Sequence, residues 1–237
     1  MKQRRERSTN LRALRGRNYR RGSFLGQLKV QEVQAPSWRP LSSGFTMPSE
    51  ELDFNEAIAM KLVAIDFETA DRSADSACAI GIVSIEKNRI TKKGYRLIRP
   101  PRRHFVFSYI HGISWADVEA QPTFSAVWDQ FVPFWKDADY FLAHNAPFDR
   151  NVLTACCSAA GRRPPRVPFI CTVRVARSHW NFRPANLPTV CTQLGISLRH
   201  HDAASDALAC ASIALRAMKE GFPIHSATVG VKMSGRK

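Results

Sequence analysis

The chain reads Lys61-Leu-Val-Ala-Ile-Asp-Phe-Glu-Thr69 about a quarter of the way along its 237 residues. The apolar run at 62–65 is typical of a buried β-strand, and side chains alternate between the two faces of a strand. Asp66 and Glu68 therefore share one face, and Phe67 lies on the other. Two carboxylates held together at the end of a rigid strand repel each other unless a cation lies between them. We expect this strand end to hold a hard divalent cation, Mg²⁺ or Mn²⁺, if later segments supply the missing oxygen ligands.

The segment from residue 60 to 222 alternates between strands and helices. Short connections join the first strand, at 61–67, to two further strands at 78–85 and 90–98, which predicts an antiparallel three-strand meander. The apolar spacing and the capping residues then predict further strands at 140–143 and 169–171, and helices at 123–136, 147–160, 172–180, 187–194 and 203–220. The sequence therefore predicts an α/β fold, with a mixed β-sheet of the meander plus parallel strands flanked by helices.

Composition limits the classes of function. The net charge is +15, and the segment 60–225 is basic by itself. A polyanionic partner is the natural inference, with nucleic acid first, although surface lysine and arginine also serve solubility. The six cysteines form no C-x-x-C pair, which favours buried free thiols in a reducing compartment. Because no apolar run reaches the length of a membrane span and no secretory signal is evident, we expect a cytoplasmic protein without a membrane partner.

The two ends of the chain differ in composition from its middle. Residues 1–59 form a basic extension, and its first 46 residues lack any sustained apolar period, so we expect disorder there. This extension could be a nucleic-acid-binding arm, an organellar transit peptide, or the product of an upstream start codon. Met47 and Met60 are in-frame starts, and Met60, directly before the first strand, is favoured. Residues 223–237 are expected to be a basic tail.

Two later segments contain the further acidic residues that the strand end requires. In His144-Asn-Ala-Pro-Phe-Asp149, the acidic residue falls in the first turn of a helix, where the helix dipole favours a carboxylate whatever its function. In His201-Asp-Ala-Ala-Ser-Asp206, the histidine and the last aspartate are five residues apart, about 140° around a helix. They can converge only if His201 precedes the helix, and Asp202 is a good N-cap residue for that boundary. The adjacent His200 is a rival for the same role, and the pairing with Asp206 decides for His201.

Taken together, the three segments resemble the motifs of the DEDDh 3′–5′ exonucleases, typified by the epsilon proofreading subunit of bacterial replicative DNA polymerase. The family reads D-x-E on the first strand, H-N-A-x-F-D on a middle helix and H-x-A-x-x-D on a late helix. This chain matches all three in order, and the resemblance covers roughly residues 60–220. Asp202 departs from the residue type that the family often has. The resemblance implies a ribonuclease H-like fold.

The resemblance also implies the roles of residues in a two-metal hydrolysis of phosphodiester bonds. Asp66 would bridge two Mg²⁺ or Mn²⁺ ions, with Glu68 and Asp206 completing one coordination sphere and Asp149 holding the other ion. His201 would accept the proton of the attacking water, and the product would be a nucleoside 5′-monophosphate released from a 3′ end. The implied substrate-binding residues are Thr69, His111, Gly112, Ile113, His144, Asn145 and Phe148. The stretch His111-Gly-Ile113 could equally be an ordinary turn.

Three functional hypotheses follow. The first is a 3′–5′ exonuclease that prefers DNA, acting on single-stranded 3′ ends, either alone, as a homodimer or with a DNA polymerase. The second is an exoribonuclease resembling RNase T or oligoribonuclease. The third is a catalytically inactive module that only binds nucleic acid, which the five intact catalytic residues argue against.

Overall fold

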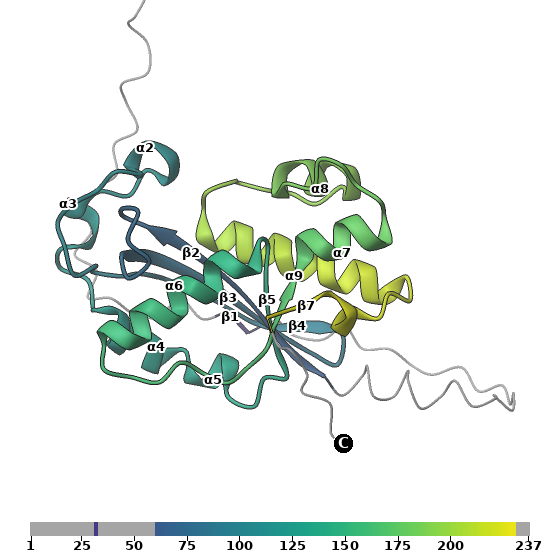
Figure 1. The fold of residues 1–237 in the computed structure, drawn as a ribbon, viewed down its shortest axis with the longest axis horizontal. Coiled ribbons are helices and arrows are strands. Elements are labelled where there is room, and N and C mark those ends of the chain that lie inside the picture. The colour runs from purple at the N-terminus through teal and green to yellow at the C-terminus, as the bar shows by residue number, and fades with distance from the viewer. Residues whose placement is uncertain (1–30, 33–59, 231–237) are drawn as a thin grey trace, which may run out of the picture.

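The computed structural model describes residues 31–32 and 60–230. A seven-stranded mixed sheet forms its centre, with the strand order β1-β4-β3-β2-β5-β6-β7 (Figure 1). The strands are β1 (Gln31–Glu32), β2 (Lys61–Thr69), β3 (Ala77–Glu86), β4 (Arg89–Leu97), β5 (Tyr140–Ala143), β6 (Phe169–Cys171) and β7 (Thr228–Val229). Strands β2, β3 and β4 form the predicted antiparallel meander, and β5 and β6 add to β2 in parallel. The predicted fold class is confirmed.

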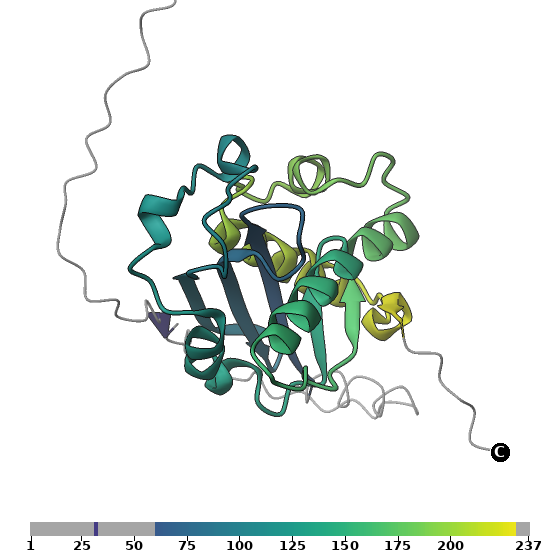
Figure 2. The same ribbon diagram turned by 60° about the vertical axis from the view of Figure 1, so that its left-hand side comes forward.

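Helices cover both faces of the sheet (Figures 1 and 2). One layer holds α4 (Phe124–Gln130), α5 (Val132–Trp135) and α6 (Ala146–Ala159), and the other holds α7 (Thr172–His179), α8 (Leu187–Leu194) and α9 (Ala203–Lys219). Two short helices, α2 (Ser108–His111) and α3 (Trp115–Val118), lie at one end of the sheet. No helix among residues 60–230 is long and apolar enough to cross a membrane.

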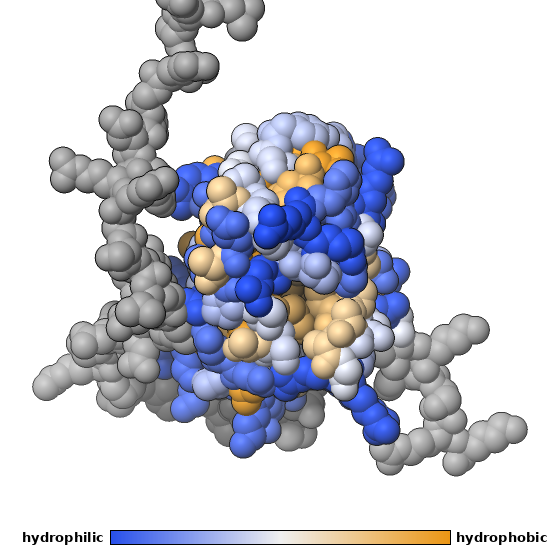
Figure 3. Space-filling model, turned by 90° about the vertical axis from the view of Figure 1, so that its left-hand side faces the viewer, coloured by the Kyte–Doolittle hydropathy of each residue, from blue (hydrophilic) through white to orange (hydrophobic). Residues whose placement is uncertain are grey.

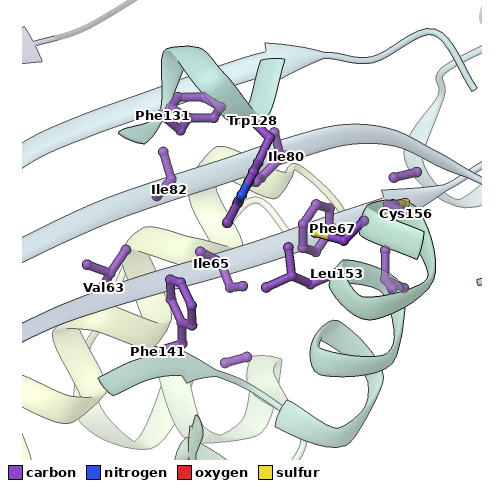
Figure 4. Packing of buried hydrophobic residues seen from close by; sticks show 14 of the residues in the cluster. Val63, Ile65, Phe67, Ile80, Ile82, Trp128, Phe131, Phe141, Leu153 and Cys156 are labelled. Atoms are coloured by element: carbon purple, nitrogen blue, oxygen red, sulfur yellow. The ribbon is translucent and has the colours of Figure 1, made fainter. Parts of the chain in front are cut away.

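Strand β2 separates two hydrophobic clusters, as its alternation requires. Val63, Ile65 and Phe67 pack under α4, α5 and α6 in a cluster rich in aromatic rings (Figure 4). Leu62 and Ala64 point to the opposite face, where α9 packs. The predicted division of this strand between two faces is therefore confirmed. All six cysteines are buried and free, as expected.

The single helix predicted for 123–136 is wrong in one respect, because the structure divides it into α4 and α5 at Phe131. Pro133 lies in the first turn of α5. Proline has no backbone N–H to donate to the preceding turn, and its ring clashes with the carbonyl four residues earlier. The apolar face of the segment is nevertheless as predicted, since Phe124, Trp128 and Phe131 are all buried.

The sequence prediction missed the short elements at both ends. Strand β1 lies within the extension 1–59 and pairs antiparallel with β4. The expected tail begins with the 3₁₀ helix η1 (Ile224–Ala227), and β7 then pairs antiparallel with β6. The folded part therefore continues past residue 222. The expected disorder at 1–46 falls, apart from residues 31–32, outside the described residues, and the division into an extension, a domain and a tail stays a prediction.

Candidate active site

Strand β2 presents Asp66 and Glu68 near its carboxyl end, on the face that α9 covers. Asp66 is half-buried, and Glu68 is 9% exposed. The strand lies in the middle of the sheet between β3 and β5, so hydrogen bonds on both edges fix its position. The two carboxylates are thus held on a rigid support, as their spacing predicts.

Asp206 reaches the same place from the first turn of α9. The side chain of Asp202 accepts a hydrogen bond from the backbone N–H of Ser205 at 3.1 Å, so it caps the helix as predicted. Carboxylate oxygens of Asp66, Glu68 and Asp206 all lie within 4.8 Å of one another. Among the described residues, the Oδ1 atom of Asp206 is buried without a hydrogen-bond partner. A buried oxygen of this kind is costly unless a donor or a cation meets it.

Asp149 approaches β2 from α6 and is 2% exposed. Its Oδ1 atom accepts a hydrogen bond from the backbone N–H of Phe67 at 3.1 Å. This bond ties the first turn of α6 to the backbone of Phe67, the residue between Asp66 and Glu68. The structure therefore brings together all four carboxylates predicted as metal ligands, three in one cluster and Asp149 directly beside it.

The cluster is strongly repulsive without a cation. Burial raises the pKa of Asp66 well above its usual value, and repulsion from Asp149, Asp206 and Glu68 adds to the effect. Burial and repulsion by Asp206 raise the pKa of Glu68 to about 7. Burial raises the pKa of Asp149 to about 8, against the lowering effect of its bond from Phe67. Four carboxylates of this kind, one with an unpartnered oxygen, fit a hard divalent cation.

The thermal stability of the metal-free protein is expected to fall as the pH rises from about 5 to about 8.5, and Mg²⁺ should reverse the fall. The folded-state pKa values of Glu68 and Asp149 lie above their ordinary values of 4.5 and 3.8. Their contribution to stability is therefore complete below about pH 4 and is lost as the pH rises through about 7 to 8. A cation binds the ionised form, so it stabilises more at high pH.

Thermal unfolding with EDTA or MgCl₂ at about pH 6 and about pH 8.5 measures this effect. The gain in Tm from Mg²⁺ should be larger at the higher pH. The Glu68→Gln variant is the matched control, because it removes one titrating group and should flatten the pH dependence of the metal-free protein. An equal Mg²⁺ gain at both pH values would contradict the prediction.

Two adjacent histidines face Asp206 in different ways. The Nδ1 atom of His200 lies 2.9 Å from Asp206 Oδ2, whereas His201 donates its backbone N–H to the same oxygen at 3.1 Å. The two rings stack with centroids 3.8 Å apart, and His201 has a positive φ of 65°. His201 precedes α9 as predicted, but the ring that contacts Asp206 belongs to His200. The sequence argument, in which pairing with Asp206 selected His201, did not anticipate this arrangement.

His111 is held by the protein through both ring nitrogens. Its Nδ1 atom accepts a hydrogen bond from the backbone N–H of Ile113 at 3.0 Å, so the proton lies on Nε2, which donates to the carbonyl oxygen of Thr69 at 3.1 Å. Burial lowers the pKa of His111 and favours this neutral form. Gly112 ends α2 with a φ of 76°. The predicted His111-Gly-Ile113 stretch therefore anchors α2 to the end of β2, and its histidine ring has no free nitrogen for a substrate.

His144 is also engaged within the protein. Its Nε2 atom donates to the carbonyl oxygen of Ala185 at 3.0 Å, and Nδ1 lies 2.9 Å from the hydroxyl of Thr172. Burial lowers its pKa to about 4. Of the other predicted substrate-binding residues in this segment, Asn145 is exposed at the start of α6 with a φ of 75°, and Phe148 is 44% exposed. The last two therefore face solvent, whereas His144 is a structural link.

The sequence argument missed Gly81, which positions α9. Gly81 in β3 is paired with Asp66 in β2. A Cβ atom on Gly81 would lie only 1.9 Å from the backbone oxygen of Ala203, the first residue of α9. An isolated glycine inside a strand is a known sign of close backbone approach, so the signal was present in the sequence.

The chain matches the family model described as "Exonuclease" (RNase_T) over residues 63–214. Among curated proteins, it is 31% identical over 172 residues to the DNA polymerase III PolC-type of Thermotoga maritima, covering 71% of this chain and 12% of that protein. It is 26% identical to DNA polymerase III subunit epsilon of Rickettsia felis, covering 65% of this chain and 72% of that subunit. The chain thus spans only about an eighth of the length of the PolC-type relative.

Solved structures have the same fold. Exonuclease X in complex with 5′ overhanging duplex DNA matches with a TM-score of 0.58 and 24% identity, over 70% of this chain and 96% of that one. The nuclease domain of 3′hExo, a DEDDh family member bound to rAMP, matches with a TM-score of 0.62 and 17% identity, over 70% of this chain and 95% of that one. With the family model matched over 63–214 and all three motifs in place, the chain belongs to the exonuclease family, and its resemblance to the DEDDh 3′–5′ exonucleases is confirmed.

Proposed function

We propose that this chain hydrolyses nucleic acid from the 3′ end, with DNA as the preferred substrate, and releases nucleoside 5′-monophosphates. The observation that carries the proposal is the cluster of Asp66, Glu68 and Asp206, whose oxygens lie within 4.8 Å of one another beside buried Asp149. The preference for DNA is supported by relatives named as DNA polymerase III components. The 3′–5′ direction is supported by DinG of Bacillus subtilis, named a 3′–5′ exonuclease.

The proposed cofactor is a pair of Mg²⁺ or Mn²⁺ ions held by Asp66, Glu68, Asp206 and Asp149. When bound, such ions neutralise charge on the phosphoryl oxygens and lower the pKa of a coordinated water. The chain itself holds the ligands on β2, α6 and α9, and the bond from Phe67 to Asp149 ties α6 to β2. This rigid support favours one fixed geometry for the scissile phosphate.

His201 is the proposed general base. Its ring is exposed beside the cluster, with a ring nitrogen within 4.8 Å of an Asp206 oxygen. Burial and the neighbouring His200 lower the pKa of His201, against the opposite effect of Asp206. The neutral ring can accept a proton from the attacking water.

His201→Ala is expected to lower kcat by roughly 10²- to 10⁴-fold, the usual contribution of a general base. His200→Ala is the matched control, because its ring contacts Asp206 but is assigned no proton transfer. It should reduce kcat less than His201→Ala does, by about ten- to hundredfold at most, the usual cost of losing a group that orients a metal ligand. Steady-state kinetics on a labelled oligonucleotide measures both values. A larger loss in His200→Ala than in His201→Ala would transfer the role of base to His200.

A second candidate function is a 3′–5′ exoribonuclease of the RNase T or oligoribonuclease kind. Two structural neighbours bring it into consideration: one is bound to rAMP, and another recognises a histone mRNA stem-loop. Both are below 25% identical, so they support the fold rather than the substrate. A non-catalytic binding module stays the least favoured alternative, because every metal-ligand carboxylate is in place.

The proposed partners are the 3′ end of a nucleic-acid strand and, by analogy with the named relatives, a DNA polymerase. The net charge of +15 suits a polyanion. Homodimerisation and a cytoplasmic location stay predictions from the sequence.

The deciding experiment uses 5′-labelled single-stranded DNA and RNA of the same sequence, with Mg²⁺, Mn²⁺ or EDTA. A ladder that shortens from the 3′ end only with metal, and faster for DNA, supports the proposal. Faster shortening of RNA would favour the exoribonuclease. No degradation of either polymer with any metal would overturn both.

A further inference from the structure

His200 contacts two groups of the candidate active site at once. With Asp206 ionised, the Nδ1–H of His200 donates to Asp206 Oδ2 at 2.9 Å. The His200 ring also stacks on the His201 ring, with centroids 3.8 Å apart and planes inclined by 24°. We propose that His200 is a positioning residue that orients both the Asp206 carboxylate and the His201 ring. The inference rests on the proposed function and deepens it, because His200 lies outside the three motifs.

The two carboxylate oxygens of Asp206 differ in their surroundings. Oδ2 accepts two hydrogen bonds, from His200 Nδ1 and from the backbone N–H of His201 at 3.1 Å. Oδ1 is buried without a hydrogen-bond partner in the part of the chain that the structure describes. The two donors on Oδ2 fix the rotation of the carboxylate and leave Oδ1 as the oxygen available to a cation. Because the Asp206 side chain is only 5% exposed, water does not readily replace a lost donor.

The His201 ring depends on the same neighbour. Among residues 31–32 and 60–230, no hydrogen bond reaches a ring nitrogen of His201, and the residue is exposed. Figure 3 looks onto the side of the molecule where α2 and α3 lie, and hydrophilic residues cover most of that face. The carboxyl end of β2 points to the same side (Figure 1). An exposed ring on such a surface rotates unless a neighbour holds it, and the stacked His200 ring provides that contact.

The loop that carries His200 is fastened to the start of α9. The backbone N–H of Arg199 donates to the hydroxyl of Ser205 at 2.7 Å, and the backbone N–H of Asp202 donates to the carbonyl oxygen of Arg199 at 3.2 Å. The guanidinium of Arg199 also lies 3.1 Å from a carboxylate oxygen of Asp202. The backbone of His200 is therefore held on both sides, so its ring can hold its neighbours in place.

Direct coordination of a metal ion by His200 is the rival explanation. Ligand atoms of His200, His201 and Asp206 lie within 4.8 Å of one another. The Nδ1 atom of His200 is, however, already engaged by Asp206. Mg²⁺ and Mn²⁺ also prefer oxygen ligands to imidazole nitrogen. Both observations favour the role of a positioning residue.

Two variants separate the two contacts. His200→Asn keeps an N–H donor near the position of Nδ1 and removes the ring. Its affinity for Mn²⁺, measured by isothermal titration calorimetry, should stay close to that of the wild type, and kcat at saturating metal should fall about two- to tenfold. His200→Phe keeps a ring for stacking and removes the donor. Its affinity for Mn²⁺ should fall about ten- to hundredfold, whereas kcat at saturating metal should fall less than in His200→Asn.

The outcomes decide between positioning, coordination and simple packing. Equal loss of Mn²⁺ affinity in both variants would make His200 itself a ligand and overturn the inference. A lower Tm in both variants, with unchanged Mn²⁺ affinity and kcat, would reduce His200 to a packing role and also overturn it. If the wild type binds Mn²⁺ but degrades neither DNA nor RNA, the proposed function fails. The Mn²⁺ affinities of the two variants then still test the contact between His200 and Asp206.

Discussion

Replacing Asp66 with asparagine is expected to lower exonuclease activity by about a hundred- to a thousandfold, the usual cost of removing one group that stabilises charge in the transition state. Asp66 lies at the centre of the cluster, with Glu68 and Asp206 within 4.8 Å. Asparagine keeps the shape of the side chain and removes its charge, so it weakens the binding of a divalent cation.

The same substitution should stabilise the metal-free protein at alkaline pH, because it removes an ionised carboxylate whose pKa is raised well above its usual value by burial and by repulsion from Asp149, Asp206 and Glu68. A simultaneous loss of activity and gain in metal-free Tm is hard to explain by unfolding. Kinetics with Mg²⁺ and thermal unfolding with EDTA measure the two effects.

Asp129→Asn is the matched control for this prediction. Asp129 is an exposed carboxylate at the end of α4, 2.6 Å from the guanidinium of Arg162. Loss of this surface ion pair should change stability little and leave activity unchanged. Retention of activity by Asp66→Asn, or a lower metal-free Tm, would contradict the assignment of Asp66 as a metal ligand.

The carboxylate set could be predicted from the sequence because strand and helix geometry constrain it. Alternation along β2 puts Asp66 and Glu68 on one face, and a capped helix start puts Asp206 behind His201. The structure has both features. The contacts of His111 and His144 could not be predicted in this way, because their partners are distant in the chain. His144 bonds to Ala185, 41 residues away, and no local pattern indicates that contact.

The helices and strands also differ in whether the local sequence or distant contacts determine them. Long periodic elements such as α9 were placed within one or two residues, because propensity and apolar spacing agree there. The short strand β7 was missed, because two residues carry no period and its pairing with β6 depends on the whole sheet. The break at Phe131 was readable in principle, since Pro133 two residues later cannot continue a helix.

Gly81 allows the start of α9, which carries Asp206, to pack closely against the sheet. Alternation puts the missing side chain of Gly81 on the face of β3 that α9 covers, beside its partner Asp66. Its hypothetical Cβ would lie 1.9 Å from the oxygen and 2.4 Å from the carbon of the Ala203 carbonyl, and 2.8 Å from the nitrogen of Ala204. These are backbone atoms of the first turn of α9, so no side-chain rotation relieves the clash. The helix start that carries Asp206 must move.

Gly81→Ala is therefore expected to reduce activity by about a hundredfold or more, since misplacement of a functional group by about 1 Å can cost that much. It should also weaken the apparent affinity for Mg²⁺, and overpacking should lower stability by about 1–3 kcal/mol. Activity as a function of Mg²⁺ concentration, together with thermal unfolding, measures these effects. Partial recovery at high Mg²⁺ is expected, because Asp66 and Glu68 stay in place.

Gly94→Ala separates a displaced ligand from simple loss of stability. Gly94 in β4 is also buried, but a Cβ there would meet the Phe131 and Phe134 rings at 2.7 and 2.9 Å, in the aromatic cluster. That cluster lies on the opposite face of the sheet from α9, so Gly94→Ala should lower Tm and leave the Mg²⁺ dependence of activity unchanged. The two variants could instead show the same Mg²⁺ dependence at matched loss of stability. Gly81 would then contribute only to stability, and other contacts of α9 would set the position of Asp206.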